Sequence, residues 1–216
     1  MLWLQKPLLP FLRGNTLVYT HPGDTFTVLM QMAFVVGIGL ALPVIGYQIW
    51  AFLSPALYKN ERRIVIPVLV VAVVLFTAGV CMAYFLVLPM TLKFLFGLEA
   101  TSLTPMITVT EYFGFVTSLC LAFGAIFEVP IVLVGLSAFG IISPQTLGKV
   151  RKFAVVISWI AAAIITPGDL FLTTLALAIP LYLLYEASVA VAWIIYRKKE
   201  RRRKAELAAE RSEAPA

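Results

Sequence analysis

The chain has 216 residues, of which 61% are apolar and only 13% are charged, and its net charge is +6. A water-soluble domain has roughly 45–50% apolar and about 25% charged residues, so the composition excludes a soluble globular core and also an intrinsically disordered chain. Two cysteines, Cys81 and Cys120, are too few for a disulfide scaffold, and their apolar surroundings predict free, buried thiols.

Five long apolar runs predict membrane-spanning helices. A helix needs about 20 apolar residues to cross roughly 30 Å of hydrocarbon. The runs are continuous and do not alternate over about ten residues, which argues against a porin-type barrel. We therefore expect an all-α polytopic membrane protein with a segment 1–25, a transmembrane domain 26–196 and a basic tail 197–216. The expected spans cover residues 26–53, 64–88, 112–139, 153–165 and 171–196.

Residues 1–25 precede the first apolar run. They lack the charged n-region and the small-residue cleavage site of a signal peptide. Their first residues, Met1-Leu2-Trp3-Leu4, look like the end of an apolar segment. We therefore expect that a preceding membrane helix is absent from this chain.

The connection after the first run, residues 54–63, carries three basic residues and one acid, Glu61. Basic residues in a short loop contribute to membrane orientation, but an acid among them does not. A carboxylate there could receive a guanidinium in a bidentate pair. Spacing alone makes this a weak indication of a binding site.

Glu128 lies in the middle of the third apolar run and is followed closely by Pro130. An acid at the centre of a membrane helix costs roughly 2.5–3.5 kcal/mol on insertion scales, so such a residue indicates function by default. Pro130 removes one backbone hydrogen bond and can kink the helix beside the carboxyl group. The structural alternative is a carboxylate satisfied by Lys149, Arg151 or water, and a functional role is favoured over it.

The fourth run, residues 153–165, has 13 residues and spans only about 20 Å, roughly 10 Å less than the hydrocarbon. Two explanations of the short helix are equally favoured: a locally thinned bilayer, or a deeper position of the basic residues 149–152 in the membrane. Asp169 follows Pro167-Gly168 in the next turn, where capping of the last helix is favoured over a direct role. For Glu186 in the last run, a functional role and simple hydrogen bonding to Tyr182 and Tyr185 are equally favoured.

The basic residues divide unequally between alternate connections. One side of the membrane receives three of them and the other side fourteen. The positive-inside rule places the fourteen, with the C-terminus, in the cytoplasm and residues 1–25 outside it. The positive charge is therefore a topology signal, with some attraction to anionic lipid, and it does not indicate nucleic-acid binding.

Signatures of catalysis are missing from the sequence. His21 is the only histidine, so a histidine metal site or a Ser–His dyad lacks residues. No Gly-rich phosphate loop of the GK[ST] type occurs. We expect neither an enzyme nor a cofactor.

Several stretches of the sequence share the pattern of one known family. They are residues 41–52, 55–63, 83–85, 124–130, 166–169 and 177–186. Together, and in this order along nearly the whole chain, they resemble the TatC family, the core subunits of the twin-arginine translocase.

The resemblance implies a receptor that binds the twin-arginine signal peptides of folded export substrates, in a bacterial plasma membrane. It also implies assembly with the single-span subunits TatA and TatB, and transport driven by the proton-motive force. Glu61 would receive the arginine pair of the signal peptide. Trp50, Phe52, Tyr58 and Arg63 resemble positions around that site. Glu128, Thr166, Asp169 and Glu186 match positions at membrane depth and at the outer turn, where partner helices are expected.

The family has six spans, and this chain matches helices two to six. The absent part comprises the first helix and the preceding cytoplasmic segment, typically containing His-Leu-x-Glu-Leu-Arg. That segment helps to form the signal-peptide site, so the chain as given is expected to bind poorly. The competing function is a proton- or ion-coupled small-molecule transporter that uses Glu128 and Glu186. A third option is an assembly scaffold without a transport role, and the acids at membrane depth argue against it.

Overall fold

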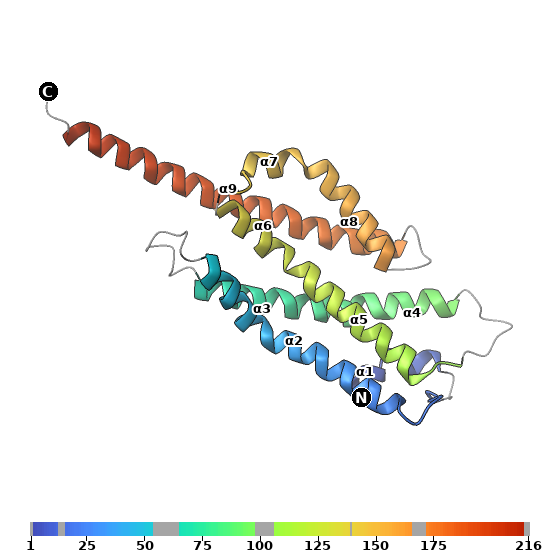
Figure 1. Ribbon diagram of the computed structural model, residues 1–216. Helices are drawn as coiled ribbons and strands as arrows, with labels where there is room; N and C mark the ends of the chain where they lie inside the picture. The colour runs from blue at the N-terminus through green and yellow to red at the C-terminus, as the bar shows by residue number, and fades with distance from the viewer. Residues whose placement is uncertain are drawn as a thin grey trace.

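The computed structural model describes residues 2–12, 16–53, 65–97, 106–138, 140–165 and 172–213. These ranges are almost entirely helical, and the β-structure among them is one isolated bridge between Val18 and Thr108. The all-α fold class is confirmed. The helical elements are α1 (Leu2–Gln5), η1 (Leu9–Phe11), α2 (Asp24–Leu53), α3 (Val65–Met82), the π-helix η4 (Ala83–Val87), α4 (Leu88–Gly97), α5 (Val109–Phe127), α6 (Val129–Ala138), α7 (Pro144–Lys149), α8 (Arg151–Ile165) and α9 (Leu172–Glu213) (Figure 1).

Local signals explain where several helices begin and end. The Thr108 side chain accepts a hydrogen bond from the Glu111 amide at 3.2 Å and so caps α5. Asp24 opens α2, and its carboxylate accepts bonds from the amides of Thr20 and His21 at 2.8 and 2.9 Å. α6 ends in a Schellman-type turn, in which the Ile141 amide reaches the Leu136 carbonyl and Gly140 adopts a φ of 76°.

Four helical units in the described ranges are long and apolar enough to cross a membrane. They cover Asp24–Ile49, Ile66–Gly97, Val109–Ala138 and Leu177–Arg201. α8 has 15 residues and is about 22 Å long, which agrees with the expectation of a short fourth helix. Two of the helices extend beyond the expected apolar runs. α4 ends at Gly97, after the run 64–88, and α9 ends at Glu213, after the run 171–196. Charged residues such as Lys, Arg and Glu are good helix formers, so a helix can continue into water where apolarity stops. The predicted span boundaries stay predictions.

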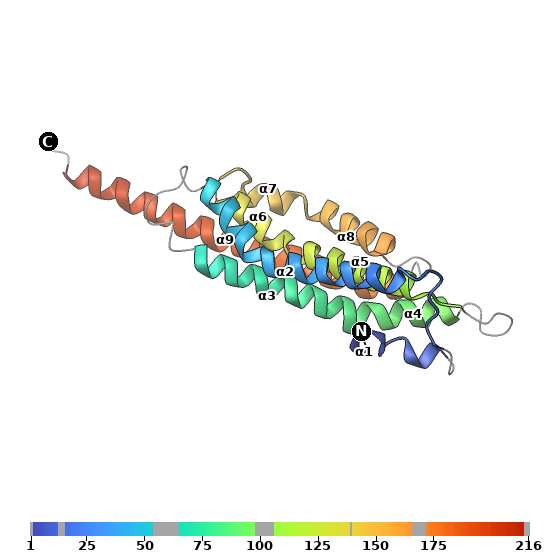
Figure 2. The same cartoon turned by 60° about the horizontal axis from the view of Figure 1, so that its bottom comes forward.

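The helices form one elongated bundle (Figures 1 and 2). α2, α3 and α5 pack against one another, and α6, α8 and α9 form the adjoining part. α8 and α9 form an antiparallel hairpin. The N-terminal segment also contributes to the core, since Leu8 and Leu12 are buried in it and Phe11 stacks on Phe96 with ring centroids 5.3 Å apart.

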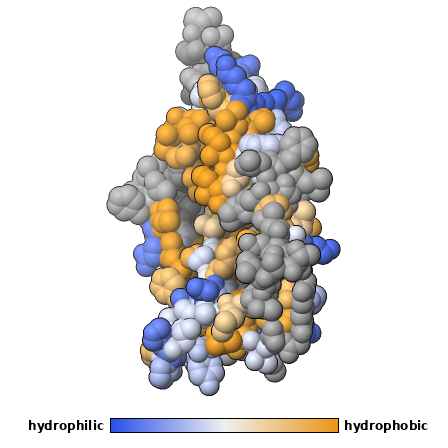
Figure 3. All heavy atoms as spheres, turned by 90° about the vertical axis from the view of Figure 1, so that its right-hand side faces the viewer, coloured by the Kyte–Doolittle hydropathy of each residue, from blue (hydrophilic) through white to orange (hydrophobic). Residues whose placement is uncertain are grey.

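Large apolar side chains cover much of the surface, and Figure 3 shows them on one face of the molecule. α2 is the extreme case, with Phe34 66% and Leu40 75% exposed. In a membrane, burying such side chains between helices brings no hydrophobic gain, because the surrounding lipid is equally apolar. Cys120 is buried as predicted, but the prediction of a buried thiol is wrong for Cys81, which is exposed. Apolar neighbours in the sequence identify a membrane helix but do not tell its lipid-facing side from its inner side.

Candidate functional site

The residues predicted to surround the acid of the first loop lie at the edge of the described structure. Tyr58, Glu61 and Arg63 are outside the described residues. Trp50 and Phe52 belong to the last turn of α2, and the structure describes their helical backbone but not their side chains. The signal-peptide site therefore stays a prediction.

Glu128 stands at the break between α5 and α6. It forms the C-cap of α5, and its amide bonds to the Ala125 carbonyl at 3.1 Å. Its own carbonyl accepts bonds from Ile131 and Val132 at 3.0 and 3.2 Å, so the backbone resumes a helix at once. Pro130 lacks an amide hydrogen and cannot donate to the preceding turn, which accounts for the break. The predicted interruption beside the carboxyl group is present.

The helix leading to Glu128 is held by an unusually close crossing of α3 and α5. A Cβ atom on Gly79 would lie 2.6 Å from the Phe123 carbonyl oxygen. A Cβ atom on Gly124 would collide with the Phe76 ring. Side chains larger than hydrogen would separate the helices at both positions, as is typical of close helix packing in membranes. The crossing fixes the helix one turn before Glu128.

One carboxyl oxygen of Glu128 is without a protein partner in the described part of the chain. This atom is Oε1, and it is buried. Arg151, one of the proposed partners, instead pairs with a different acid. A buried, unpaired carboxyl oxygen is expensive at this depth and needs an explanation beyond packing.

Glu186 has two partners. Arg151 at the start of α8 contributes Nη2 at 3.0 Å from Oε2, and Tyr182 donates its hydroxyl to Oε1 at 2.7 Å. Tyr185, also considered as a partner, donates instead to the Leu147 carbonyl of α7 at 2.6 Å. The side chains of Arg151 and Glu186 are 50% and 29% exposed, so the pair is only partly desolvated. These contacts tie α7 and α8 to α9.

Sequence reasoning counted Arg151 only among the topology charges and as a possible partner of Glu128. A signal for its pairing with Glu186 was nevertheless present. In an antiparallel helix hairpin, residues equally distant from the turn lie opposite each other. Arg151 and Glu186 are symmetric about the middle of residues 166–171, which connect α8 and α9. Thr166 and Asp169 belong to that connection and are outside the described residues.

The two acids lie at similar heights along neighbouring helices. Leu133 of α6 packs in one apolar cluster with Val189 of α9. Glu128 is about 7.5 Å of helix rise before Leu133, and Glu186 is about 4.5 Å before Val189. The structure describes no contact between the two acids, and their environments differ. Glu186 has a polar partner on each carboxyl oxygen, whereas Glu128 has a buried oxygen without a partner in the described residues.

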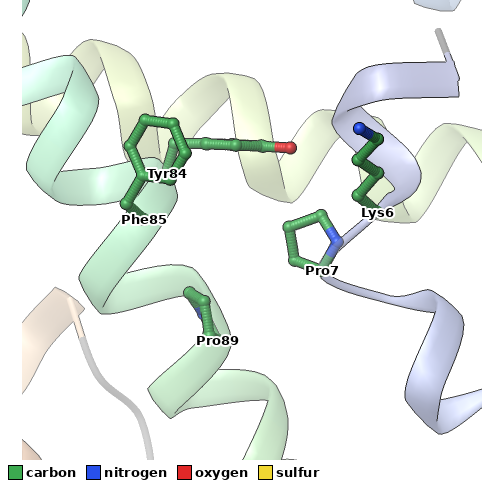
Figure 4. A pocket seen from close by; sticks show the side chains of 5 residues that line it. All are labelled: Lys6, Pro7, Tyr84, Phe85 and Pro89. Carbon is green, nitrogen blue, oxygen red and sulfur yellow. The ribbon is translucent and has the colours of Figure 1, made fainter.

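A shallow cavity of about 390 Å³ lies at the other end of the bundle, between the N-terminal segment and η4 (Figure 4). Lys6 and Pro7 line one side, and Tyr84, Phe85 and Pro89 the other. The π-helix places Tyr84 inward, at 7% exposure, and Phe85 outward, at 62%. Of the predicted site residues whose side chains the structure describes, Glu128 and Glu186, neither lines this cavity. Within the described ranges, no three His, Cys, Asp or Glu residues gather as metal ligands would.

Comparisons with known proteins give a consistent result. The family model of the Sec-independent protein translocase protein TatC matches residues 1–180. The TatC protein of Aquifex aeolicus is 42% identical over 204 residues, which cover 94% of this chain and 84% of that protein. The TatC protein of Escherichia coli K12 is 41% identical over 177 residues, or 82% of this chain and 68% of that one. A crystal structure described as the twin arginine translocase receptor TatC superposes with a TM-score of 0.71, at 41% identity, over 90% of this chain and 85% of its own.

Proposed function

The chain belongs to the TatC family of Sec-independent protein translocases, and on that premise we propose that it is the signal-peptide receptor and core subunit of a twin-arginine translocase. As a member of this family it is an integral membrane protein and a component of a protein translocase. The finer assignment is that it binds twin-arginine signal peptides on the cytoplasmic side of a bacterial plasma membrane. It then helps folded proteins to cross, driven by the proton-motive force.

Glu61 is the proposed acceptor of the arginine pair. It is the single acid in a loop with three basic residues, and a carboxylate can bind a guanidinium through two parallel hydrogen bonds. Arg63, Tyr58, Phe52 and Trp50 are proposed to surround it. The crystal structure named as a twin arginine translocase receptor, which is 41% identical to this chain, supports the receptor role on which this residue assignment depends.

The environment of Glu128 is the main support for the proposed contact with partner helices. Its buried Oε1 atom has no partner among the described residues, and it lies at a helix break in a membrane span. We assign it, with Thr166 and Asp169, to contacts with the single-span subunits TatA and TatB. Glu186 belongs to the same predicted set, and its pairing with Arg151 supports a role in positioning the α8–α9 hairpin for those contacts.

Charge reversal at Glu61 tests the receptor assignment. In the full-length protein in its native membrane, Glu61→Lys should abolish crosslinking to a twin-arginine signal peptide, because a positive charge in place of the carboxylate would then face the arginine pair. Crosslinking of a photoreactive signal peptide to membranes containing the variant measures this. The matched control is Glu200→Lys, which makes the same charge change on α9.

A signal peptide with both arginines replaced by alanine should crosslink poorly to the unmodified protein as well. Undiminished crosslinking of the Glu61→Lys variant would remove Glu61 from the site. Equal loss in the Glu200→Lys control would show a general charge effect in place of a specific site.

The competing function is ion-coupled transport of a small molecule through Glu128 and Glu186. The pairing of Glu186 with Arg151 and Tyr182 weighs against it, because an acid that carries ions must be able to exchange its partners. Substrate uptake by the purified chain in liposomes, without partner subunits, would favour the transporter instead.

A further inference from the structure

The helix α9 continues well beyond its apolar part (Figure 1). Its extension, predicted to lie in the cytoplasm, carries basic residues. Arg197, Lys198, Lys199, Arg201 and Lys204 are all exposed there. The positive-inside rule explains their sign but not their arrangement on the helix. Residues four apart share a helix face, so Trp193, Arg197 and Arg201 form one stripe, whereas Lys198 and Lys199 point to other sides.

The base of the stripe has the character of a membrane interface. Trp193 and Tyr196 pack edge to face with ring centroids 6.2 Å apart, at the end of the apolar run. Aromatic residues with a polar edge concentrate at the level of the lipid headgroups. The Arg197 guanidinium lies over the Trp193 ring, 5.4 Å from its centroid. Trp193 is itself held by the cluster of Leu147, Val189 and Ala192.

Arg197, Glu200, Arg201 and Lys204 line a shallow notch of about 270 Å³ above this base. Glu200 is the acid in the notch, and Lys204 pairs with it at 3.0 Å. No ion pair of Arg197 or Arg201 is formed within the described ranges. The notch therefore has a net positive charge. It contains two arginines whose Cα atoms are separated by about 6 Å of helix rise.

We propose that the notch between Arg197 and Arg201 binds the phosphodiester headgroup of an anionic phospholipid from the cytoplasmic leaflet. Guanidinium groups bind phosphate oxygens through paired hydrogen bonds, and a lysine lacks this geometry. The whole notch lies within about 12 Å of helix rise from the end of the apolar run, so the lipid headgroups are in reach. Trp193 below the notch adds an apolar surface for the start of the acyl chains. The signal-peptide function is not needed for this inference.

Lipid retention by the purified full chain tests the proposal. Native mass spectrometry would count bound phosphatidylglycerol and phosphatidylcholine on the unmodified protein and on two variants. Arg197→Gln/Arg201→Gln should retain phosphatidylglycerol at least about tenfold less, because it removes both guanidinium groups that donate paired hydrogen bonds to the phosphate oxygens. The matched control Lys198→Gln/Lys199→Gln removes the same charge from other sides of the same turn and should retain it nearly unchanged.

Equal losses in the two variants would overturn the proposal, because they would reveal attraction by total charge. Displacement of the lipid by inorganic phosphate at millimolar concentration would point to a free-anion site and overturn the lipid assignment. Binding of a polyglutamate peptide as tightly as the lipid would overturn it too. Arg197→Lys/Arg201→Lys keeps the charge and should bind at an intermediate level. Full binding by this variant would overturn the role of the guanidinium pair. Helix content from circular dichroism checks that each variant is folded.

Discussion

Glu128 keeps a buried carboxyl oxygen without a hydrogen-bond partner in the described part of the chain. Burying such a group lowers stability unless a partner compensates it. The adjoining helix crossing at Gly79 and Gly124 is tight, so the neighbouring backbone cannot easily move to relieve it. A residue that opposes stability in a rigid surrounding is most simply explained by a partner that arrives from outside.

Replacing Glu128 by an apolar residue should make the chain more stable but weaken its contact with partner subunits. Glu128→Leu should raise the free energy of unfolding in detergent by about 1–2 kcal/mol, because an unpaired polar group leaves the protein interior. It should also reduce crosslinking to the single-span subunits. Thermal unfolding and site-specific crosslinking measure the two effects.

Glu111→Leu is the control, since Glu111 is an exposed acid in the first turn of α5. It should leave crosslinking unchanged and lower the free energy of unfolding by at most about 1 kcal/mol, because an acid in the first turn of a helix is stabilising. A marked loss of stability in Glu128→Leu would mean that the carboxylate has a stabilising partner and would contradict the assignment.

The α8–α9 hairpin illustrates how elements are held in place. Its register brings Arg151 opposite Glu186, and the neighbouring Tyr182 completes the coordination of the carboxylate. α8 is short, so it depends on α9 for its position. Ala154, Ser158 and Ala162 are its buried side chains, and their small size allows the two helices to approach closely.

Reciprocal substitution tests this ion pair as a unit. Arg151→Glu should destabilise the chain by about 1 kcal/mol, because it places two acids together, and the effect is moderate since the pair is half exposed. The double variant Arg151→Glu/Glu186→Arg should recover most of that loss. A double-mutant cycle on thermal unfolding in detergent gives the coupling energy. Lys152→Glu, at the adjacent exposed position, should behave near the unmodified protein, and an additive cycle would contradict the pairing.

At the scale of the whole molecule, the distribution of charge determines orientation. Three basic residues lie on one side of the predicted topology and fourteen on the other. The fold is compatible with this division, because the basic extension of α9 and the basic start of α8 lie toward the same end of the bundle (Figure 1). The N-terminal segment, with Leu8 in the core, lies near the opposite end.

Cysteine labelling tests the orientation directly. In a chain with Cys81 and Cys120 replaced by alanine, Thr16→Cys should react with a membrane-impermeant maleimide on intact cells. Ser212→Cys should react only after the membrane is permeabilised, because the tail is expected in the cytoplasm. Labelling of Ser212→Cys on intact cells, equal to that of Thr16→Cys, would refute the orientation.

Much of the architecture could be predicted from particular residues. The apolar runs predicted the helices, Pro130 predicted the break at Glu128, and the 13 residues of 153–165 predicted a short fourth helix. The partners of the acids could not be predicted, because hydrogen bonds depend on distances between separate helices. Glu186 had two tyrosines as candidates, and the structure adds Arg151 and redirects Tyr185 to Leu147.

The sequence by itself determined the class of protein and predicted its orientation, since hydrophobicity and charge act on each segment independently of the others. It also carried the family resemblance, because that depends on residue order. Only the tertiary structure decided which acid is paired and which keeps a buried oxygen without a described partner. It also decided that Cys81 faces outward and that two arginines of α9 flank one notch. These properties arise from helix register and crossing, which depend on packing between segments far apart in the chain.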